Sequence, residues 1–276
     1  MISKEIIKIC DSITKDTLDE GMIGVVSGKR RTRGYNVLAF TDFDEYAVQY
    51  PGGSEIAESP SGSRWYPVID GRLTAFIAGN PGAGKSYLAK ELINLLPPTS
   101  EILLFTALDE KDGNFQEFED EERIYKIRME PDNLERLTLT AIRERCKNPI
   151  LLFDDIDKIR DPKVSKLTFK ILEDALANGR GHRNHDGRGD IHTIVTSHSL
   201  NDYLKTKYSL ENSDFVCVFP QSTTYAQMKR LFEKIGLDKK LCDEIVSLGK
   251  SGEVRSVIIK KTAPMYVLAG SLIYSI

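Results

Sequence analysis

The stretch FIAGNPGAGKSYLAKEL, residues 76–92, decides the fold. It begins as an apolar run, breaks into glycines around a proline, and resumes as a series of helix-forming residues. Its central part, GNPGAGKS (79–86), fits the phosphate-binding pattern G-x-x-x-x-G-K-[ST], with a strand expected before it and a helix after it. We therefore interpret it as a loop that gives up side chains so that the phosphates of a nucleotide can approach the backbone.

Each residue type in this loop has a physical role in holding a triphosphate. The glycines let backbone N–H groups turn towards phosphate oxygens, and the helix that follows adds the positive end of its dipole. Lys85 is expected to contact the β- and γ-phosphates, and Ser86 to bind Mg²⁺. The predicted nucleotide-binding residues are Gly79, Asn80, Pro81, Gly82, Ala83, Gly84, Lys85, Ser86 and Tyr87. A glycine-rich turn that merely links a strand to a helix is the alternative interpretation.

Such a loop needs acidic residues at the end of a buried strand beside it, and NPILLFDDIDKI (148–159) supplies them. Asp154 ends the apolar run and is expected to hold Mg²⁺ through water. Asp155 follows it and is expected to polarise the attacking water as a general base. Without the glycine loop, two adjacent acids would indicate a helix cap or a solvated turn. Asp157 is interpreted as a loop or cap residue.

A third strand also ends in polar side chains, in HTIVTSHSLNDY (192–203). A side chain in this position could reach the γ-phosphate and report hydrolysis, and Thr196, Ser197 and His198 are the candidates. The alternative is ordinary helix capping, because Ser197 or Ser199 would make a good N-cap.

Arginines amid glycines and histidines fill ANGRGHRNHDGRGD (177–190), between the second and third of these strands. A solvated loop is one interpretation, and a metal site has no supporting spacing. The other interpretation is an arginine finger that enters the ATP site of a neighbouring subunit, with Arg180 the first candidate and Arg183 the second. A finger supplied in this way requires an oligomer, with a ring the expected form.

Short apolar runs alternate with amphipathic helices from residue 67 onwards, which predicts an α/β fold with a mostly parallel sheet and helices on both faces. Residues 1–66 are predicted to form a small N-terminal extension, and residues 67–276 the main domain. In the extension we expect a helix over 3–18, strands at 37–40 and 46–50, and a loop over 52–63. In the main domain we expect strands at 73–79, 101–107, 124–127, 149–155, 192–197 and 215–220, a closing edge hairpin of 254–260 with 265–270, and helices over 85–96, 132–147, 163–178, 223–235 and 238–247.

Composition limits the class of protein only loosely. The chain has 276 residues, 41% of them hydrophobic and 29% charged, with a formal net charge of −3, so the whole chain is not basic. The four cysteines show no paired spacing, which predicts neither a disulfide framework nor a metal site. No apolar run approaches the roughly 18–20 residues that cross a bilayer, and the N-terminus does not resemble a signal peptide. We expect a soluble protein in the cytosol.

Two other nucleotide-binding classes do not fit the sequence. Small GTPases carry a DxxG turn and an NKxD base-reading motif, and neither arrangement is found here. Nucleoside kinases carry an arginine-bearing lid and a small-substrate pocket. The expected strand at 124–127 and the helix after it lie between the glycine loop and the acidic strand, an order typical of ATP-driven motors.

The motifs GNPGAGKS, LLFDDID, NGRGHRN and IVTSH, in this order, resemble those of the viral genome-packaging ATPases of large double-stranded DNA viruses, of poxvirus and giant-virus type, in the FtsK–HerA superfamily. The later segments 215–240 and 260–270 resemble that family too, so the resemblance covers roughly residues 70–276. One departure is HDGRGD (185–190), which lengthens the loop before the third strand and leaves open which arginine is the finger.

The resemblance implies a RecA-like core that assembles into a pentameric or hexameric ring. It implies that the ring threads duplex DNA into a preformed capsid, with ATP and Mg²⁺ as cofactors and with capsid or other packaging proteins as partners. It places the loop roles on Lys85 and Ser86, the acidic roles on Asp154 and Asp155, the finger within 180–183 and the sensor near Ser197 and His198. It also implies a place in the host-cell cytoplasm, at the virus assembly site, or in the virion.

Two other functions stay open from the residues alone. An AAA+-type remodeller or helicase loader acting on protein would have a C-terminal helical lid, whereas this chain returns to strands after 238–247. A module that binds ATP only to control assembly would not need Asp155 beside Asp154. The basic run KRRTR (29–33) is a candidate surface for DNA or a partner, or an ordinary solvated turn.

Overall fold

A computed structural model describes residues 25–26, 35–36, 47–49, 55–58, 67, 69, 71–107, 115–181, 189–198, 200, 203–262, 265–270 and 272–275. Contacts divide the chain into two compact units, residues 69–216 and residues 1–68 with 217–276, and each is described by itself. The division into an extension of residues 1–66 and a main domain stays a prediction.

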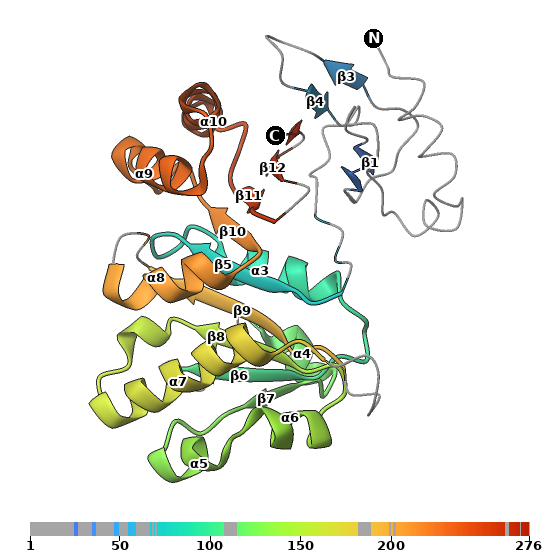
Figure 1. The fold of residues 1–276 in the computed structure, drawn as a ribbon, viewed down its shortest axis with the longest axis vertical. Coiled ribbons are helices and arrows are strands. Elements are labelled where there is room, and N and C mark those ends of the chain that lie inside the picture. Colours follow the sequence, from blue (N-terminus) through green and yellow to red (C-terminus); the bar gives the residue numbers. More distant parts are fainter. Residues whose placement is uncertain are drawn as a thin grey trace. The chain divides into compact units, whose positions relative to one another are not determined.

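A parallel sheet forms the centre of the 69–216 unit (Figure 1). Its strands lie in the order β5 (Thr74–Ala78), β9 (His192–Ser197), β8 (Ile150–Asp154), β6 (Ile102–Thr106) and β7 (Ile124–Lys126). Every pair among these neighbours is parallel. The boundary between the two units falls inside strand β10 (Phe215–Val218). The acidic strand β8 is therefore not beside β5 as expected, because β9 separates them.

Helices cover both faces of this sheet. Helix α3 (Lys85–Asn94) packs on β5 and β9, and α4 (Gln116–Asp120) contacts β7. Helix α7 (Pro162–Asn178) packs on β9 and contacts α5 (Pro131–Arg136), α6 (Leu139–Arg145) and α8 (Tyr203–Asn212). The chain moves one way along the sheet from β5 to β7 and the other way from β7 to β9. Right-handed crossovers therefore place α3 on one face and the α5–α8 group on the other.

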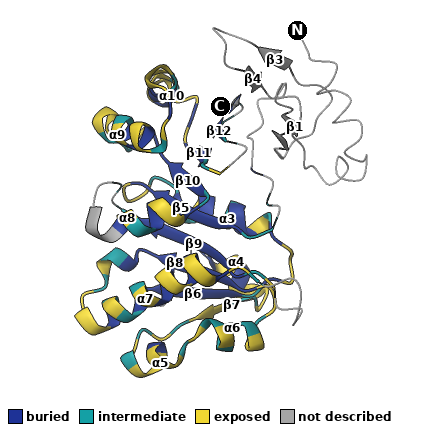
Figure 2. Ribbon diagram, in the orientation of Figure 1, coloured by how far each residue is buried: buried dark blue, intermediate teal, exposed yellow. Residues whose placement is uncertain are grey.

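The core of this unit is the sheet itself, as the dark strands in Figure 2 show. All residues of β5, β6, β8 and β9 are buried, which is the pattern of parallel strands covered on both faces. Phe105 and Phe153 are paired in the register of β6 and β8, and their rings stack with centroids 4.5 Å apart. The helices keep exposed outer faces, so the predicted fold class, an α/β fold with a mostly parallel sheet and helices on both faces, is confirmed.

The second unit contains an antiparallel sheet and a helical pair. Strands β11 (Val257–Lys260), β12 (Tyr266–Ala269), β13 (Leu272–Ser275), β4 (Glu55–Glu58) and β3 (Ala47–Gln49) follow one another, each antiparallel to the next. Helices α9 (Tyr225–Ile235) and α10 (Lys239–Ser251) pack on each other. Strands β1 (Val25–Val26) and β2 (Tyr35–Asn36) form a separate antiparallel pair.

Several predicted elements differ from those in the structure. The helix expected over 132–147 is two short helices, because Leu137 is extended and the Thr138 hydroxyl accepts a hydrogen bond from the backbone N–H of Ala141, which starts α6 afresh. The segment 52–63, expected to be a loop, contains strand β4, which pairs with β13. That pairing also means that the closing hairpin is not at an edge.

The elements that were not predicted include α4, α8 and β13. The expected helix over 3–18 and the strand over 37–40 lie outside the described residues. Among the described residues, no helix is both long enough and apolar enough to cross a lipid bilayer.

Candidate nucleotide-binding site

Three strands of the parallel sheet end at the same edge, and the site lies there. In the register of β5 and β9, Ala78 is level with Ser197. In the register of β8 and β9, Phe153 is level with Val195, so Asp154 comes level with Thr196. The glycine loop, the acidic pair and the polar end of β9 therefore meet although the sequence separates them widely. Ligand sites of open α/β sheets lie at this carboxyl edge.

The glycine loop turns sharply between β5 and α3. Gly82 and Gly84 have φ angles of 76° and 108°, in the left-handed region that side chains other than glycine rarely adopt. The backbone N–H of Gly79 donates to the carbonyl of Ser197 at 3.1 Å, and that of Ala83 donates to the carbonyl of Asn80 at 3.1 Å. The first turn of α3 contains no acidic residue, so the positive end of the helix is available to an anion.

The other predicted loop residues differ in exposure. Asn80, Pro81 and Gly82 are exposed and Ser86 is half-buried. Tyr87 leaves 55% of its surface exposed.

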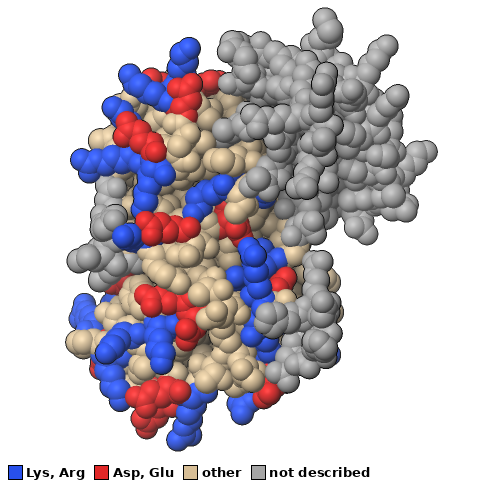
Figure 3. Space-filling model, in the orientation of Figure 1, with Lys and Arg blue, Asp and Glu red and all other residues tan. Residues whose placement is uncertain are grey.

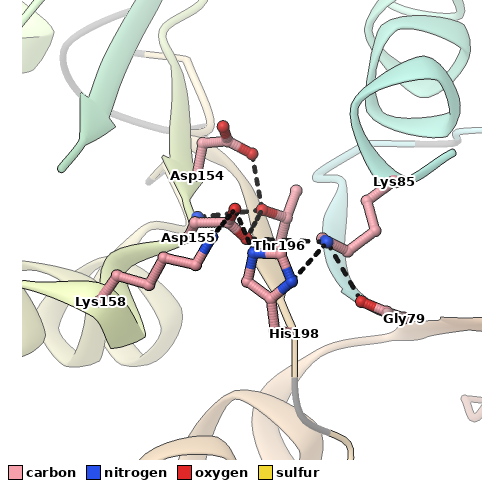
Figure 4. Close-up of polar contacts among 7 residues, drawn as sticks. All are labelled: Gly79, Lys85, Asp154, Asp155, Lys158, Thr196 and His198. Atoms are coloured by element: carbon pink, nitrogen blue, oxygen red, sulfur yellow. Dashed lines mark hydrogen bonds and ion pairs between the residues drawn. The ribbon is translucent and has the colours of Figure 1, made fainter. Parts of the chain in front are cut away.

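Lys85, the first residue of α3, is buried, and its side chain turns back towards Gly79 at the end of β5 (Figure 4). Its ammonium group donates to the carbonyl of Gly79 at 3.1 Å and lies 3.2 Å from Nδ1 of His198. The same nitrogen lies 3.8 Å from Oδ1 of Asp155. Burial lowers the pKa of Lys85, because it removes water from the charged form, and the nearby carboxylate of Asp155 acts in the opposite direction.

Asp155 is the centre of the polar cluster. Its Oδ2 lies 2.5 Å from Nε2 of His198 and 3.3 Å from Nζ of Lys158. Lys85 can only donate, so it leaves Nδ1 of His198 as the acceptor, and the ring proton on Nε2 then donates to Asp155. His198 thus connects the loop lysine to the acidic residue.

The backbone of Asp155 is in the left-handed region, with φ 50° and ψ 36°. For a residue other than glycine this conformation costs of the order of 1–3 kcal/mol and is concentrated at functional sites. It makes the chain turn sharply after β8, and the side chain of Asp155 then faces β9 and Lys85 (Figure 4).

Thr196 connects the two acidic residues. Its hydroxyl donates to Oδ1 of Asp154 at 2.6 Å and accepts from the backbone N–H of Asp155 at 3.1 Å. Asp154, Asp155 and Thr196 are 4%, 6% and 1% exposed, so these bonds lie in a largely water-free environment. Ser197, the predicted sensor beside it, is buried too and joins the loop through its backbone carbonyl.

Lys158 is the member of the cluster that the sequence did not single out. It lies on the short 3-10 helix η2 (Ile156–Lys158), three residues after Asp155. The spacing alone was a weak signal, because a lysine three residues after an aspartate is common on solvated turns. Contact with Asp155 depends on the sharp turn after β8, which the sequence did not show.

Arg180 lies at the opposite end of the sheet from the cluster. The backbone N–H of Ile191, just before β9, donates to the carbonyl of Gly179 at 2.8 Å. Strand β9 then runs six residues to Ser197, which is roughly 20 Å at about 3.3 Å per residue. The exposed Arg180 is therefore far from the site of its own chain. Arg183 lies outside the described residues.

The backbone around Arg180 is firmly held. Arg143 donates to the carbonyls of Asn178 and Arg180, at 2.9 and 3.2 Å. Asp190 accepts from the backbone N–H of Gly181 at 2.7 Å. Arg72, whose pKa is lowered chiefly by burial, donates to the carbonyls at the end of α7, including those of Ala175 and Leu176.

The residues present suit a nucleotide with a divalent cation. A turn with two glycines at positive φ, a helix start without acidic residues, and a buried lysine together favour phosphate. Asp154 and Asp155 supply carboxylate oxygens and Ser86 a hydroxyl, which are the ligand types that Mg²⁺ prefers. The described residues contain no group of three or more His, Cys, Asp or Glu side chains that could hold a metal ion without a nucleotide.

No family model matches the chain. A curated relative, the uncharacterized protein V3 of Sputnik virophage, is 31% identical over 213 residues, which are 73% of this chain and 76% of that protein. The chain is also similar to the solved genome packaging NTPase B204 of Sulfolobus turreted icosahedral virus 2 in complex with sulfate, at 14% identity over 72% of this chain and 96% of that one, with a TM-score of 0.47. The pCW3 conjugation coupling protein TcpA with ATPγS matches at 15% identity over 96% of this chain and 82% of that one, with a TM-score of 0.43.

The order of the strands and helices, together with the glycine loop, shows that this protein has the P-loop NTPase fold. Within that class the chain belongs to the family of the virophage protein V3. Membership of a viral family agrees with the resemblance drawn from the sequence motifs.

Proposed function

We propose that this protein is an ATP-driven motor that moves double-stranded DNA into a viral capsid by Mg²⁺-dependent ATP hydrolysis in an oligomeric ring. The observation that carries the proposal is the convergence of Lys85, Asp155 and His198 at one edge of the sheet. The glycine loop, the acidic strand end and the polar end of β9 meet at this edge, and ATP hydrolysis requires such groups close together. The motor role is supported by the order of the motifs and by the viral family of the chain.

In the proposed reaction, the residues of the loop bind the triphosphate. Backbone N–H groups of the glycine loop and of the start of α3 surround the phosphates, and Lys85 exchanges its contact with Asp155 for the β- and γ-phosphates. Ser86 and Asp154 would hold a Mg²⁺ ion, Asp154 through water. When bound, the cation neutralises charge that develops on the phosphate oxygens.

Asp155 then acts as the general base that orients the attacking water and accepts its proton. His198 is the proposed sensor, because it contacts both Lys85 and Asp155 and would respond to any movement of either group. Ser197, with its carbonyl on the loop, is the second proposed sensor.

Arg180 is proposed as the arginine finger of the adjoining subunit, with Arg183 as the second candidate. About 20 Å of strand β9 separates its backbone from the site of its own chain, so it can serve only the site of another copy. A closed ring of five or six copies would supply every site with a finger from its neighbour.

Contact with DNA would be made through phosphates, without reading of bases. On the described part of the face shown in Figure 3, basic and acidic side chains are interspersed. The track is therefore proposed to be built from several subunits, and the basic run 29–33 lies outside the described residues. Capsid or other packaging proteins are the proposed partners.

The test is the ATPase rate measured with and without long duplex DNA, beside the mass of the assembly. We expect duplex DNA to stimulate hydrolysis in a species of ring size. Stimulation by a protein client in place of DNA would favour an AAA+-like remodeller or helicase loader. Full activity in a strictly monomeric species would contradict the proposed ring.

A further inference from the structure

The geometry points to Thr196 as a positioning residue that fixes Asp154 and Asp155 relative to each other. The inference rests on the proposed ATPase function and adds a residue to its site. Thr196 acts through the two carboxylates: its hydroxyl holds the side chain of Asp154 and the backbone of Asp155 at the same time.

Both hydrogen bonds use one oxygen atom, and this determines their directions. The hydroxyl has one proton, which it donates to Oδ1 of Asp154 at 2.6 Å. Its lone pair accepts from the N–H of Asp155 at 3.1 Å. A longer contact of 3.5 Å joins the same oxygen to Oδ1 of Asp155. The bond to Asp154 is charge-assisted and therefore stronger than a bond between neutral groups.

The strand register explains why the residue at position 196 of β9 contacts both Asp154 and Asp155. Residues of neighbouring parallel strands that are level with one another point to the same face, and Thr196 comes level with Asp154. The residue after β8, Asp155, is in the left-handed conformation, and its N–H donates to the Thr196 hydroxyl. A buried backbone N–H without a partner is costly, so this bond also stabilises the strained turn.

Burial separates the role of Thr196 from that of a sensor. Only 1% of the residue is exposed, and its hydroxyl is engaged by the two acidic residues. A nucleotide that occupies the loop would therefore meet Asp155 and His198 before Thr196. The effect of Thr196 on hydrolysis must pass through the orientation of the carboxylates.

The experiment compares Thr196→Val, which keeps the shape and removes the hydroxyl, with Thr196→Ser, which keeps the hydroxyl. Thr193→Val is the matched control: Thr193 is buried on the same strand, and its hydroxyl has no hydrogen-bond partner among the described residues. Thr196→Ala repeats the test if the valine variant does not fold. Thermal unfolding of each variant is measured first.

Two quantities are measured for each folded variant: kcat with KM for ATP, and the Mg²⁺ concentration needed for half-maximal binding of a non-hydrolysable ATP analogue. Partners that orient metal ligands typically change affinity or activity by about 10- to 100-fold. For Thr196→Val we expect kcat to fall by about that factor, KM to change little, and the Mg²⁺ requirement to rise. Thr196→Ser and Thr193→Val should stay near the wild type.

The outcomes separate this inference from the proposed function. If the wild type does not hydrolyse ATP, the proposed function fails. If the wild type is active and Thr196→Val matches Thr193→Val in both kcat and Mg²⁺ requirement, the positioning role is overturned. Equal losses in the serine and valine variants would also overturn it, because the hydroxyl would then not be the group that matters.

Discussion

At the scale of single residues, Lys85 is in an environment that is unfavourable for a charged ammonium group without a bound anion. It is 7% exposed, and burial lowers its pKa, so the folded chain holds a cation that costs free energy. Its neighbours, the Gly79 carbonyl, His198 and Asp155, offset part of that cost. A phosphate group would offset it better, because it places full negative charges at the loop.

Replacing this lysine by alanine tests the nucleotide site directly. We predict that Lys85→Ala loses ATP hydrolysis and weakens ATP binding at least tenfold. The reason is that Lys85 is the one buried basic residue of α3, all of which the structure describes. Lys90→Ala is the matched control, since Lys90 is on the same helix and pairs with Glu117 at 2.7 Å. Calorimetric titration with an ATP analogue and a phosphate-release assay measure both effects. Normal turnover in Lys85→Ala would refute the assignment.

Replacing the proposed base should separate binding from hydrolysis. Asp155→Asn keeps the size of the side chain and removes the charge that would accept a proton from water. We predict a fall in kcat of about 100-fold or more, with ATP binding retained. Asp157→Asn, two residues along on η2, is the control and should hydrolyse ATP normally. Loss of ATP binding in Asp155→Asn would mean that its role is structural.

At the scale of elements, strand β9 supports the site at one end and the arginine segment at the other. Its last residues contact the loop and the acidic pair. At its first residue, His192 is 7% exposed, and its Nδ1 accepts a hydrogen bond from the N–H of Leu73 at 3.0 Å. Protonation of Nδ1 would remove this acceptor from the start of β5.

The stability of the unit should therefore depend on pH through His192. Burial lowers its pKa from 6.5 to about 4, so between these values the unfolded chain binds a proton that the folded chain does not. Buried, neutral His192 therefore costs no stability above pH 6.5. As the pH falls from 6.5 towards 4, the free energy of unfolding decreases by about 3 kcal/mol. Denaturant unfolding of the wild type and of His192→Asn across this range measures it. The asparagine oxygen can replace the acceptor without titrating, so a variant with the same pH dependence as the wild type would contradict the prediction.

At the scale of the whole molecule, the proposed function requires a second copy of the chain to supply the arginine finger. The described edge of the sheet provides the loop, two carboxylates and a histidine, while Arg180 is held near the far end of β9. Arg143 and Asp190 fix the backbone around Arg180, as expected of a segment that presents a side chain to another molecule. The proposed partner for this end is a second copy.

Mixing two inactive variants tests that arrangement. Subunits with Lys85→Ala keep Arg180, and subunits with Arg180→Ala keep the loop, so neighbours in a mixed ring can complete one another. If subunits mix at random, about a quarter of the interfaces should combine an intact loop with an intact finger. We predict that mixing restores ATPase activity to about a quarter of the wild-type rate, whereas each variant alone stays inactive. No restoration would argue against a finger supplied by another subunit.

Much of the site could be predicted because its residues belong to short local patterns. The loop 79–86, the acids at 154–155 and the polar end of β9 were all placed from runs of apolar residues ending in polar ones. Lys158 and the coupling role of Thr196 were not found, because both depend on the left-handed turn at Asp155. Nothing in the local sequence distinguishes that turn from an ordinary strand end.

What the sequence by itself determined is the class of fold and the set of chemical groups, since hydrophobic periodicity and a glycine pattern are local properties of the chain. Only the tertiary structure decided the strand order, in which β9 separates β5 from β8 and brings Thr196 against Asp154. It also decided that β4 pairs with β13, that the helix expected over 132–147 is interrupted, and that Arg180 lies far from its own site. The physical reason is that strand pairing and register are set by packing between distant segments, which no local pattern records.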